Sequence, residues 1–207
     1  MCMSMEQYKT ILLKYLPEPS VEQVYSWLME YNIHLKISKK RSSKLGDYRP
    51  PQNGKGHQIT VNYDLNPYAF LITLVHEIAH LLVWEKHHNK VRAHGSEWKE
   101  TYRELMIPFF GMDIFPDDIT SALGNYLSKS YASSGSDLNL SRTLQKYDPD
   151  PGLTLENIEE GSIFSLPNGI TFKKGTLNRK RYRCVRMDNN RVYLVNPLVR
   201  VTLVESL

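Results

Sequence analysis

The segment LITLVHEIAHLLVW, residues 71–84, constrains this chain more than any other part of the sequence. It is as apolar as a buried core helix, yet it contains His76, Glu77 and His80. Burying a neutral polar group without a partner costs roughly 2–7 kcal/mol, and burying a charge costs more. Whatever this segment folds into must therefore supply partners for these three side chains.

The same segment predicts a metal-binding helix. Asn66 and Pro67 predict its start, with Asn as the N-cap and Pro in the first turn. In a helix that runs to about residue 86, His76 and His80 lie one turn apart and can converge on one ion, while Glu77 projects about 100° away and can reach a water on it. This is the H-E-x-x-H arrangement of zinc metalloproteases, with glutamate as the general base. The alternative is a core helix whose histidines are satisfied by neighbouring backbone.

A catalytic zinc takes three protein ligands and keeps one position open. We expect His94, in RAHGSEW, to be the third ligand, because it follows His80 by 14 residues and the chain has room to fold back. Gly95 allows a tight turn before the next helix. The competing ligands are nearer histidines or glutamates of the next helix: His87, His88, Glu97, Glu100 and Glu104.

Composition places few further limits on the chain. Its 207 residues are 41% hydrophobic and 23% charged, and the net charge of +4 allows a nucleic-acid partner without requiring one. The two cysteines, Cys2 and Cys184, argue against a disulfide framework and for a reducing compartment. The N-terminus lacks the pattern of a signal peptide, and the apolar segment is too short and too interrupted for a membrane span. We therefore expect a cytoplasmic protein with no membrane partner.

Hydrophobic periodicity predicts an α+β fold. Two amphipathic helices in the first 31 residues precede the alternating runs IHLKIS and HQITV, which predict a small sheet with a short strand between them. Helices beginning at Ser96 and in DDITSALGNYLSK complete a first domain over residues 1–130. Residues 131–152, rich in Ser, Asp and Pro, predict a linker. Residues 153–207 contain five short β-like runs, which predict a small barrel or curled sheet.

The motif and its surroundings resemble the SprT-like zinc metalloprotease family, whose eukaryotic relatives include Spartan. The family pattern is H-E-x-x-H, a loop, and H-G-x-x-[FW] opening the next helix. This chain matches it at His76, Glu77, His80, His94, Gly95 and Trp98. The resemblance implies a zincin-like domain over residues 1 to about 130 that holds one Zn²⁺ on the three histidines. It also implies hydrolysis of peptide bonds by a zinc-bound water with Glu77 as the catalytic base. The implied partner is a polypeptide substrate, with DNA-associated proteins as candidates.

The C-terminal module departs from that family. Many members carry a zinc ribbon with four cysteine ligands there, whereas this chain has only Cys184 in the region. We therefore expect residues 153–207 to stand in the place of the ribbon and to be held by their own apolar core. Cys184 is then expected to be a small buried residue rather than a reactive one.

The C-terminal module is also basic, with no acidic residue from Gly161 to Met187. Positive charge interleaved with aromatic residues predicts a surface that follows a phosphate backbone, and the alternative is a solvated strand face. The candidate nucleic-acid-binding residues are Lys173, Lys174, Arg179, Lys180, Arg181 and Arg183. A second basic cluster near the small sheet consists of Lys36, Lys39, Lys40, Arg41 and Lys44.

Two other functions compete with the peptidase. One is a nucleic-acid-binding or transcription-associated factor with a structural, non-catalytic zinc; the other is a zinc hydrolase of small amides. Glu77 favours the peptidase over the first, because a structural site needs no base. Tyr48 and Arg49 are residue types that could stabilise an oxyanion, but the sequence does not place them near the zinc, so we assign them no role.

Overall fold

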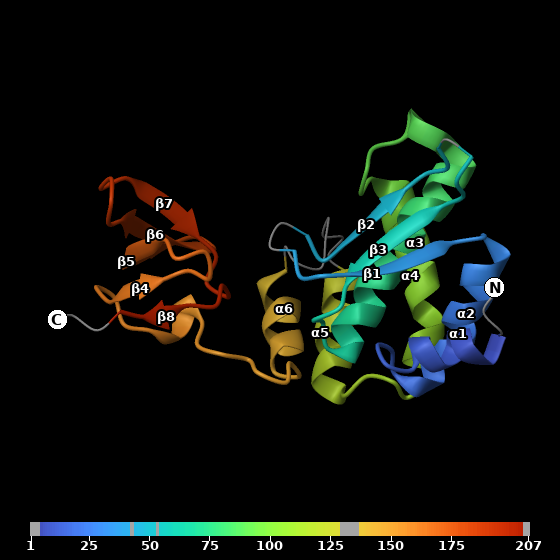
Figure 1. Ribbon diagram of the computed structural model, residues 1–207, viewed down its shortest axis with the longest axis horizontal. Helices are drawn as coiled ribbons and strands as arrows, with labels where there is room; N and C mark the ends of the chain where they lie inside the picture. The colour runs from blue at the N-terminus through green and yellow to red at the C-terminus, as the bar shows by residue number, and fades with distance from the viewer. Residues whose placement is uncertain (1–4, 42–43, 53, 129–136, 205–207) are drawn as a thin grey trace. The chain divides into compact units, whose positions relative to one another are not determined.

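The computed structural model describes residues 5–41, 44–52, 54–128 and 137–204 (Figure 1). The chain divides into two compact units, Met1–Asp148 and Pro149–Leu207, and each has its own hydrophobic core. We call them the first unit and the second unit. Helices with a small sheet build the first, and an antiparallel sheet builds the second, so the predicted α+β class is confirmed.

Helices dominate the first unit. They are α1 (Met5–Leu12), α2 (Val21–Glu30), α3 (Pro67–His87), α4 (Ser96–Phe110), α5 (Asp117–Ser128) and α6 (Leu138–Gln145), with short 3-10 helices η1 (Glu18–Ser20) and η2 (His88–Lys90). The strands are β1 (His34–Ser38), β2 (Gly46–Arg49) and β3 (Gln58–Asn62). The helix and the strands predicted around the H-E-x-x-H motif are therefore present within one or two residues of their expected bounds.

The small sheet has the order β1-β3-β2, with β1 parallel and β2 antiparallel to the central β3. Alternation in β3 places Ile59 and Val61 in the core, where the sheet packs on α3 (Figure 1). β2 is an outer strand of this sheet, and it also packs on α3. β2 therefore lies beside the helix that carries the motif, and no described strand pairs with its other edge.

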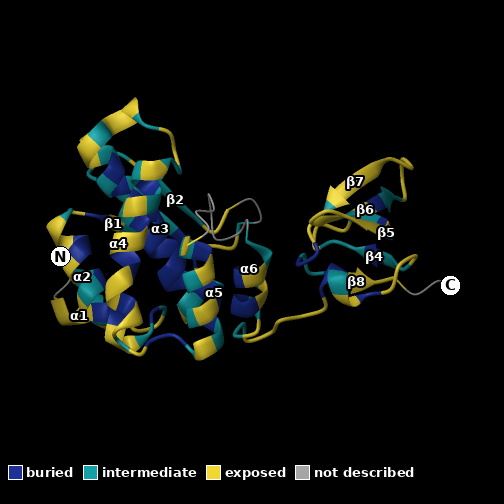
Figure 2. Cartoon of the chain, turned by 180° about the vertical axis from the view of Figure 1, so that it is seen from behind, coloured by how far each residue is buried: buried dark blue, intermediate teal, exposed yellow. Residues whose placement is uncertain are grey.

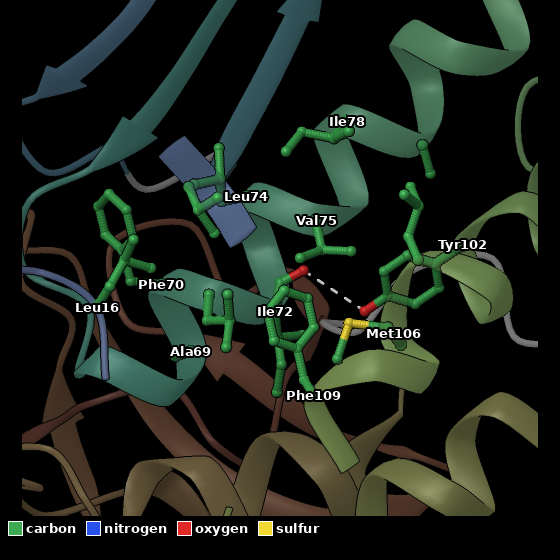
Figure 3. Close-up of a cluster of buried hydrophobic side chains, with 14 of the residues drawn as sticks. Leu16, Ala69, Phe70, Ile72, Leu74, Val75, Ile78, Tyr102, Met106 and Phe109 are labelled. Atoms are coloured by element: carbon green, nitrogen blue, oxygen red, sulfur yellow. Dashed lines mark hydrogen bonds between the residues drawn. The ribbon is translucent and has the colours of Figure 1, made fainter. Parts of the chain in front are cut away.

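Helix α3 is the centre of the first unit. Asn66 caps it as predicted, because its side chain accepts a hydrogen bond from the Ala69 N–H at 3.0 Å. Apolar residues surround it on all sides, and on the α4 side the Tyr102 hydroxyl donates to the Ile72 carbonyl at 3.5 Å (Figure 3). The expectation that this segment is too short and too interrupted to span a membrane needs correction, because Pro67–Lys90 meets the length and hydropathy of a span. However, 72% of its most apolar window is buried inside the protein. Figure 2 shows α3 as a mostly buried helix, which is the pattern of a core helix.

The linker predicted over residues 131–152 needs correction at α6, which packs on α5; residues 131–136 lie outside the described part of the chain. Asp137 caps α6 by accepting from the Leu140 N–H at 2.9 Å, and Leu140 and Leu144 are buried. The Asn66 side chain also donates to the Leu144 carbonyl at 2.9 Å. The Ser-, Asp- and Pro-rich residues on either side concealed this amphipathic helix, and the first unit extends to Asp148.

The second unit is a five-stranded antiparallel sheet with the order β7-β6-β5-β4-β8. Its strands are β4 (Ile163–Ser165), β5 (Thr171–Asn178), β6 (Arg181–Arg186), β7 (Val192–Val195) and β8 (Thr202–Leu203), preceded by the 3-10 helix η4 (Leu155–Asn157). A bulge interrupts β5 at Gly175, where an added Cβ would lie 2.3 Å from the Arg183 carbonyl oxygen. The five predicted β segments are confirmed.

The second unit has a core of its own, as the sequence predicted. It consists of Leu155, Ile158, Phe164, Phe172, Cys184 and Val201. Cys184 is a fully buried free thiol within it, in the small hydrophobic role expected for it. Cys2 lies outside the described residues.

Candidate metal centre

Three histidine side chains from two elements converge on one point in the first unit. The Nε2 atom of His80 lies 3.3 Å from that of His76 and 2.9 Å from that of His94, and the His94 and His76 Nε2 atoms are 3.1 Å apart. A tetrahedral ion with nitrogen ligands at about 2.0–2.1 Å has ligand-to-ligand edges of about 3.3 Å. The three nitrogens therefore form a triangle close to one face of such a tetrahedron, and a metal ion fits it.

Hydrogen bonding among the histidines cannot account for this triangle. Each Nε2 is either a donor or an acceptor, so of three mutually close nitrogens at least two have the same role. Two lone pairs or two N–H groups then face each other at about 3 Å. A cation shared by three lone pairs removes this conflict, and imidazole nitrogen is a common donor to transition metals.

The surroundings keep these imidazoles neutral, which is the form that binds a metal. Burial, followed by the charges of the other histidines, lowers the pKa of His76 to about 3. Burial and the charge of His94 lower the pKa of His80 to about 4, and burial lowers that of His94 as well. Their lone pairs are therefore available at neutral pH.

A short loop brings His94 back to α3. The chain leaves the helix at His88, which has φ 50°, and turns again at His94, which has φ 58°. Gly95 was predicted to allow the tight turn at this point, but its φ is −70°, an ordinary value. The residue with the left-handed backbone conformation is His94. Gly95 matters for space instead, since an added Cβ would lie 3.0 Å from the Arg92 carbonyl oxygen.

The competing third ligands lie outside the histidine group. Of the described residues, only His76, His80 and His94 form a group that could hold a metal ion. Glu97 instead accepts a hydrogen bond from the Ser96 hydroxyl at 3.1 Å. The ring of Trp98 closes one side of the group, with its centroid 4.5–5.3 Å from the three imidazole centroids. Trp98 is 1% exposed and therefore also shields the histidines from water.

Glu77 is buried between α3 and the outer strand β2. Its carboxylate accepts a hydrogen bond from the Tyr48 backbone N–H, and a Cβ added to Gly46 would lie 2.8 Å from its Oε1 atom. Burial and the nearby charge of Asp47 raise the pKa of Glu77 to about 8. A carboxyl with a raised pKa can exchange protons near neutrality, and the missing side chain of Gly46 makes room for it.

Residues 19–115 match the family model of the SprT-like family. This segment is similar to the SprT-like family. It contains the three strands, α3, the three histidines, Glu77 and Trp98. The SprT-like family is generally associated with metallopeptidase activity, which agrees with a histidine triad that could hold a metal ion. No curated protein matches the chain significantly.

Tyr48 and Arg49, to which the sequence assigns no role, lie in different environments. Tyr48 lines a cavity together with His80, and its hydroxyl lies 2.9 Å from the His57 Nδ1 atom. Arg49 is exposed, and its Nε atom pairs with Asp47 at 3.2 Å. The sequence does not predict a role for Gly46 beside Glu77, because a close approach between a strand and a helix leaves no local signal in the sequence.

The six basic candidates of the second unit do not form one surface. Lys173, Arg179, Lys180, Arg181 and Arg183 are exposed along β5, β6 and the turn between them. Lys174 is 5% exposed, and its ammonium donates to the Ile158 carbonyl at 2.6 Å. The inclusion of Lys174 therefore needs correction: neighbouring residues on a strand face opposite sides, and this one faces the core.

Proposed function

We propose that this chain is a zinc-dependent metallopeptidase of the SprT-like type with a zincin-like catalytic domain. The observation that carries the proposal is the convergence of three neutral imidazoles beside a buried carboxyl group that lies against an outer strand. In this proposal His76, His80 and His94 hold one Zn²⁺ ion. When bound, zinc would lower the pKa of a water ligand toward 7 and polarise the scissile carbonyl group.

Glu77 is proposed as the general base and then the general acid. Its carboxylate takes a proton from the attacking water and delivers it to the leaving amine. The Tyr48 backbone N–H and the space at Gly46 fix the carboxyl group for both transfers. An extended polypeptide can add along the outer edge of β2, so that backbone hydrogen bonds hold it whatever its sequence.

DNA is proposed as a second partner, bound through the second unit. The exposed residues Lys173, Arg181 and Arg183 lie on adjacent strands and provide positive charge suited to phosphates. The basic cluster of the first unit offers less, since Arg41 and Lys44 pair with Asp47. The double variant Arg181→Ala, Arg183→Ala should weaken binding to single-stranded DNA and flatten its salt dependence, whereas Lys14→Ala in the first unit should not. The proposed setting is the cytoplasm, where Cys184 stays reduced.

The test of the main proposal compares the wild type with Glu77→Gln, both loaded with zinc. Each is incubated with a mixture of basic DNA-binding proteins, with and without single-stranded DNA, and cleavage is followed on gels. The variant should cleave at least about 100-fold more slowly. A chelator should abolish cleavage by the wild type, and added zinc should restore it. If neither protein cleaves while both bind DNA, a nucleic-acid-binding factor with structural zinc replaces the peptidase.

A further inference from the structure

A cavity of about 200 Å³ opens beside His80. It lies between the outer strand β2, the C-terminal turns of α3, the loop that leads to His94, and α4. We propose that this cavity is a specificity subsite that takes one large apolar side chain of the substrate, such as leucine, methionine or phenylalanine. This inference deepens the proposed peptidase function and rests on it.

The cavity shares its walls with the candidate metal centre. His80 contributes to both, and so does Trp98, whose ring packs against all three histidines. Trp98 is 1% exposed, and Val83 on α3 is 8% exposed. A side chain that enters the cavity therefore belongs to a residue whose backbone lies close to the metal, which is where a substrate residue next to the scissile bond must lie.

The lining favours an apolar occupant. Val83, Trp84, Val91 and Trp98 supply aliphatic and aromatic surface, and burying such surface contributes about 25 cal/mol per Å². None of the described residues that line the cavity is acidic, and Arg92 lies at its exposed side. A lysine or arginine side chain would therefore find no counter-charge there. The volume is also below the about 300–1,000 Å³ of small-molecule sites, as suits a single side chain.

A hydrogen-bonded chain fixes the Tyr48 wall of the cavity. The His57 Nε2 atom lies 3.1 Å from the Glu85 carboxylate, and its Nδ1 atom lies 2.9 Å from the Tyr48 hydroxyl. In the tautomer that satisfies both contacts, Nε2–H donates to Glu85 and Nδ1 accepts from Tyr48. The hydroxyl hydrogen of Tyr48 is thus directed at His57 rather than into the cavity.

Ring packing holds the same wall. The His57 ring stacks on Tyr48 with centroids 5.9 Å apart and meets Trp84 edge-on at 5.7 Å. Because His57 is 8% exposed, these contacts are largely protected from solvent. Tyr48 also belongs to β2, so a polypeptide added along that strand would pass the opening of the cavity. The Tyr48 side of the cavity is therefore held in place by hydrogen bonds and ring packing.

The test measures peptide binding to zinc-loaded Glu77→Gln, which does not consume its ligand. The probes are the peptides Gly-Gly-X-Gly-Gly with phenylalanine, leucine, alanine or lysine at X. Tryptophan fluorescence reports binding, because Trp84 and Trp98 line the cavity and Trp27 is the one other tryptophan of the chain. The phenylalanine and leucine peptides should bind at least about 10-fold more tightly than the alanine and lysine peptides.

Filling the cavity should remove this preference. In the Glu77→Gln background, Val83→Phe adds a ring inside the cavity, and Ile107→Phe adds the same ring at a position on α4 that is 61% exposed. In Val83→Phe, the affinities of the four peptides should differ by no more than about threefold. In Ile107→Phe, the affinities should be the same as in the parent protein. If Val83→Phe does not fold, Trp84→Ala, which removes a wall, should weaken the phenylalanine peptide at least about fivefold. Equal affinities in the parent protein, or a preference that survives both cavity variants, would overturn the subsite.

The sequences cut by the wild type separate this inference from the proposed function. Denatured proteins are digested with the zinc-loaded wild type, and the cut sites are identified by mass spectrometry. Large apolar residues enriched at one position beside the cut are expected. Preferential binding without any cleavage would overturn the peptidase and keep the apolar site. Cleavage without preference, together with equal peptide affinities, would keep the peptidase and overturn the subsite.

Discussion

Each unit buries a polar side chain that can carry charge, but within the described part of the chain only the one in the second unit has hydrogen-bond partners for its buried polar group. In the second unit, the Lys174 ammonium donates to a backbone carbonyl and lies 4.1 Å from the centroid of the Tyr182 ring. In the first unit, the His76 Nδ1 atom is buried with no hydrogen-bond partner among the described residues. Its Nε2 atom faces two other imidazole nitrogens. Lys174 is satisfied within the protein, and His76 is not.

The difference shows that burial alone does not mark a functional group. A buried polar group whose hydrogen bonds are all made inside the protein stabilises the fold, and replacing it leaves its partners unsatisfied. A buried polar group with unmet bonds costs stability until something from outside binds it. By this criterion the His76 region is a candidate binding site and Lys174 is a structural residue.

The largest expected effect comes from His76→Leu. Zinc affinity should fall by more than about 100-fold, because loss of a direct ligand exceeds the 10–100-fold cost of losing a partner behind a ligand. The unfolding free energy of the metal-free protein should not decrease, since the variant removes an unsatisfied polar group. Chelator competition measures the affinity, and urea unfolding followed by tryptophan fluorescence measures the stability. His87→Leu, at the last residue of the same helix, should leave zinc binding unchanged; equal loss in both variants would contradict the site.

Gly46→Ala tests the contact between β2 and Glu77. The added methyl group would displace the carboxyl group, and misplacement by about 1 Å costs on the order of 100-fold in rate. The kcat/KM for peptide cleavage should fall about 10–100-fold while zinc affinity stays within about twofold. Gly124→Ala is the matched control, since nothing lies within 4 Å of its added Cβ. Full activity in Gly46→Ala would show that the space beside Glu77 is not needed.

Lys174→Met tests whether the internally hydrogen-bonded lysine stabilises the second unit. It should destabilise the second unit by about 1–3 kcal/mol, because the Ile158 carbonyl loses its buried donor. Hydrogen exchange of β5 and β6, read by mass spectrometry, measures this change, and zinc affinity should not alter. The neighbouring exposed Lys173→Met should change stability by less than about 0.5 kcal/mol. If Lys174→Met is equally neutral, its hydrogen bonds do not stabilise the unit.

The smallest expected effect concerns Asp47, a charged group of the first unit that is satisfied internally. Burial would raise its pKa, but hydrogen bonds and charges from Arg41 and Lys44 outweigh burial and lower it below the ordinary value of 3.8. A lowered pKa means that the stabilisation is complete above about pH 4 and is lost as the pH falls through the folded-state pKa. Asp47→Asn should therefore cost about 1 kcal/mol at pH 7 and nothing in strong acid. Urea unfolding at pH 7 and pH 2 would reveal the difference, and a pH-independent cost would rule out the charge as its origin.

Much of the fold follows from local patterns in the sequence. The cap at Asn66, the apolar run of α3 and the four-residue spacing of His76 and His80 act within one helix, where geometry is fixed by the helical repeat. Strand alternation likewise predicts β1, β3 and the sheet of the second unit. Helix α6 was not predicted, because its cap at Asp137 and its leucines lie within a segment rich in Ser, Asp and Pro. Its packing on α5 and the hydrogen bond from Asn66 are tertiary contacts that the local pattern does not show.

The sequence by itself determined the motif, the pair of histidines on one turn of a helix and the base beside them, since these depend on residues at most four apart. Only the tertiary structure decided that His94 completes the triangle, that Gly46 and Tyr48 hold Glu77, and that Lys174 faces inward. These contacts join segments up to about 30 residues apart or depend on which face of a strand is covered. Strand register and packing of the whole unit set such contacts, and no short stretch of sequence encodes them.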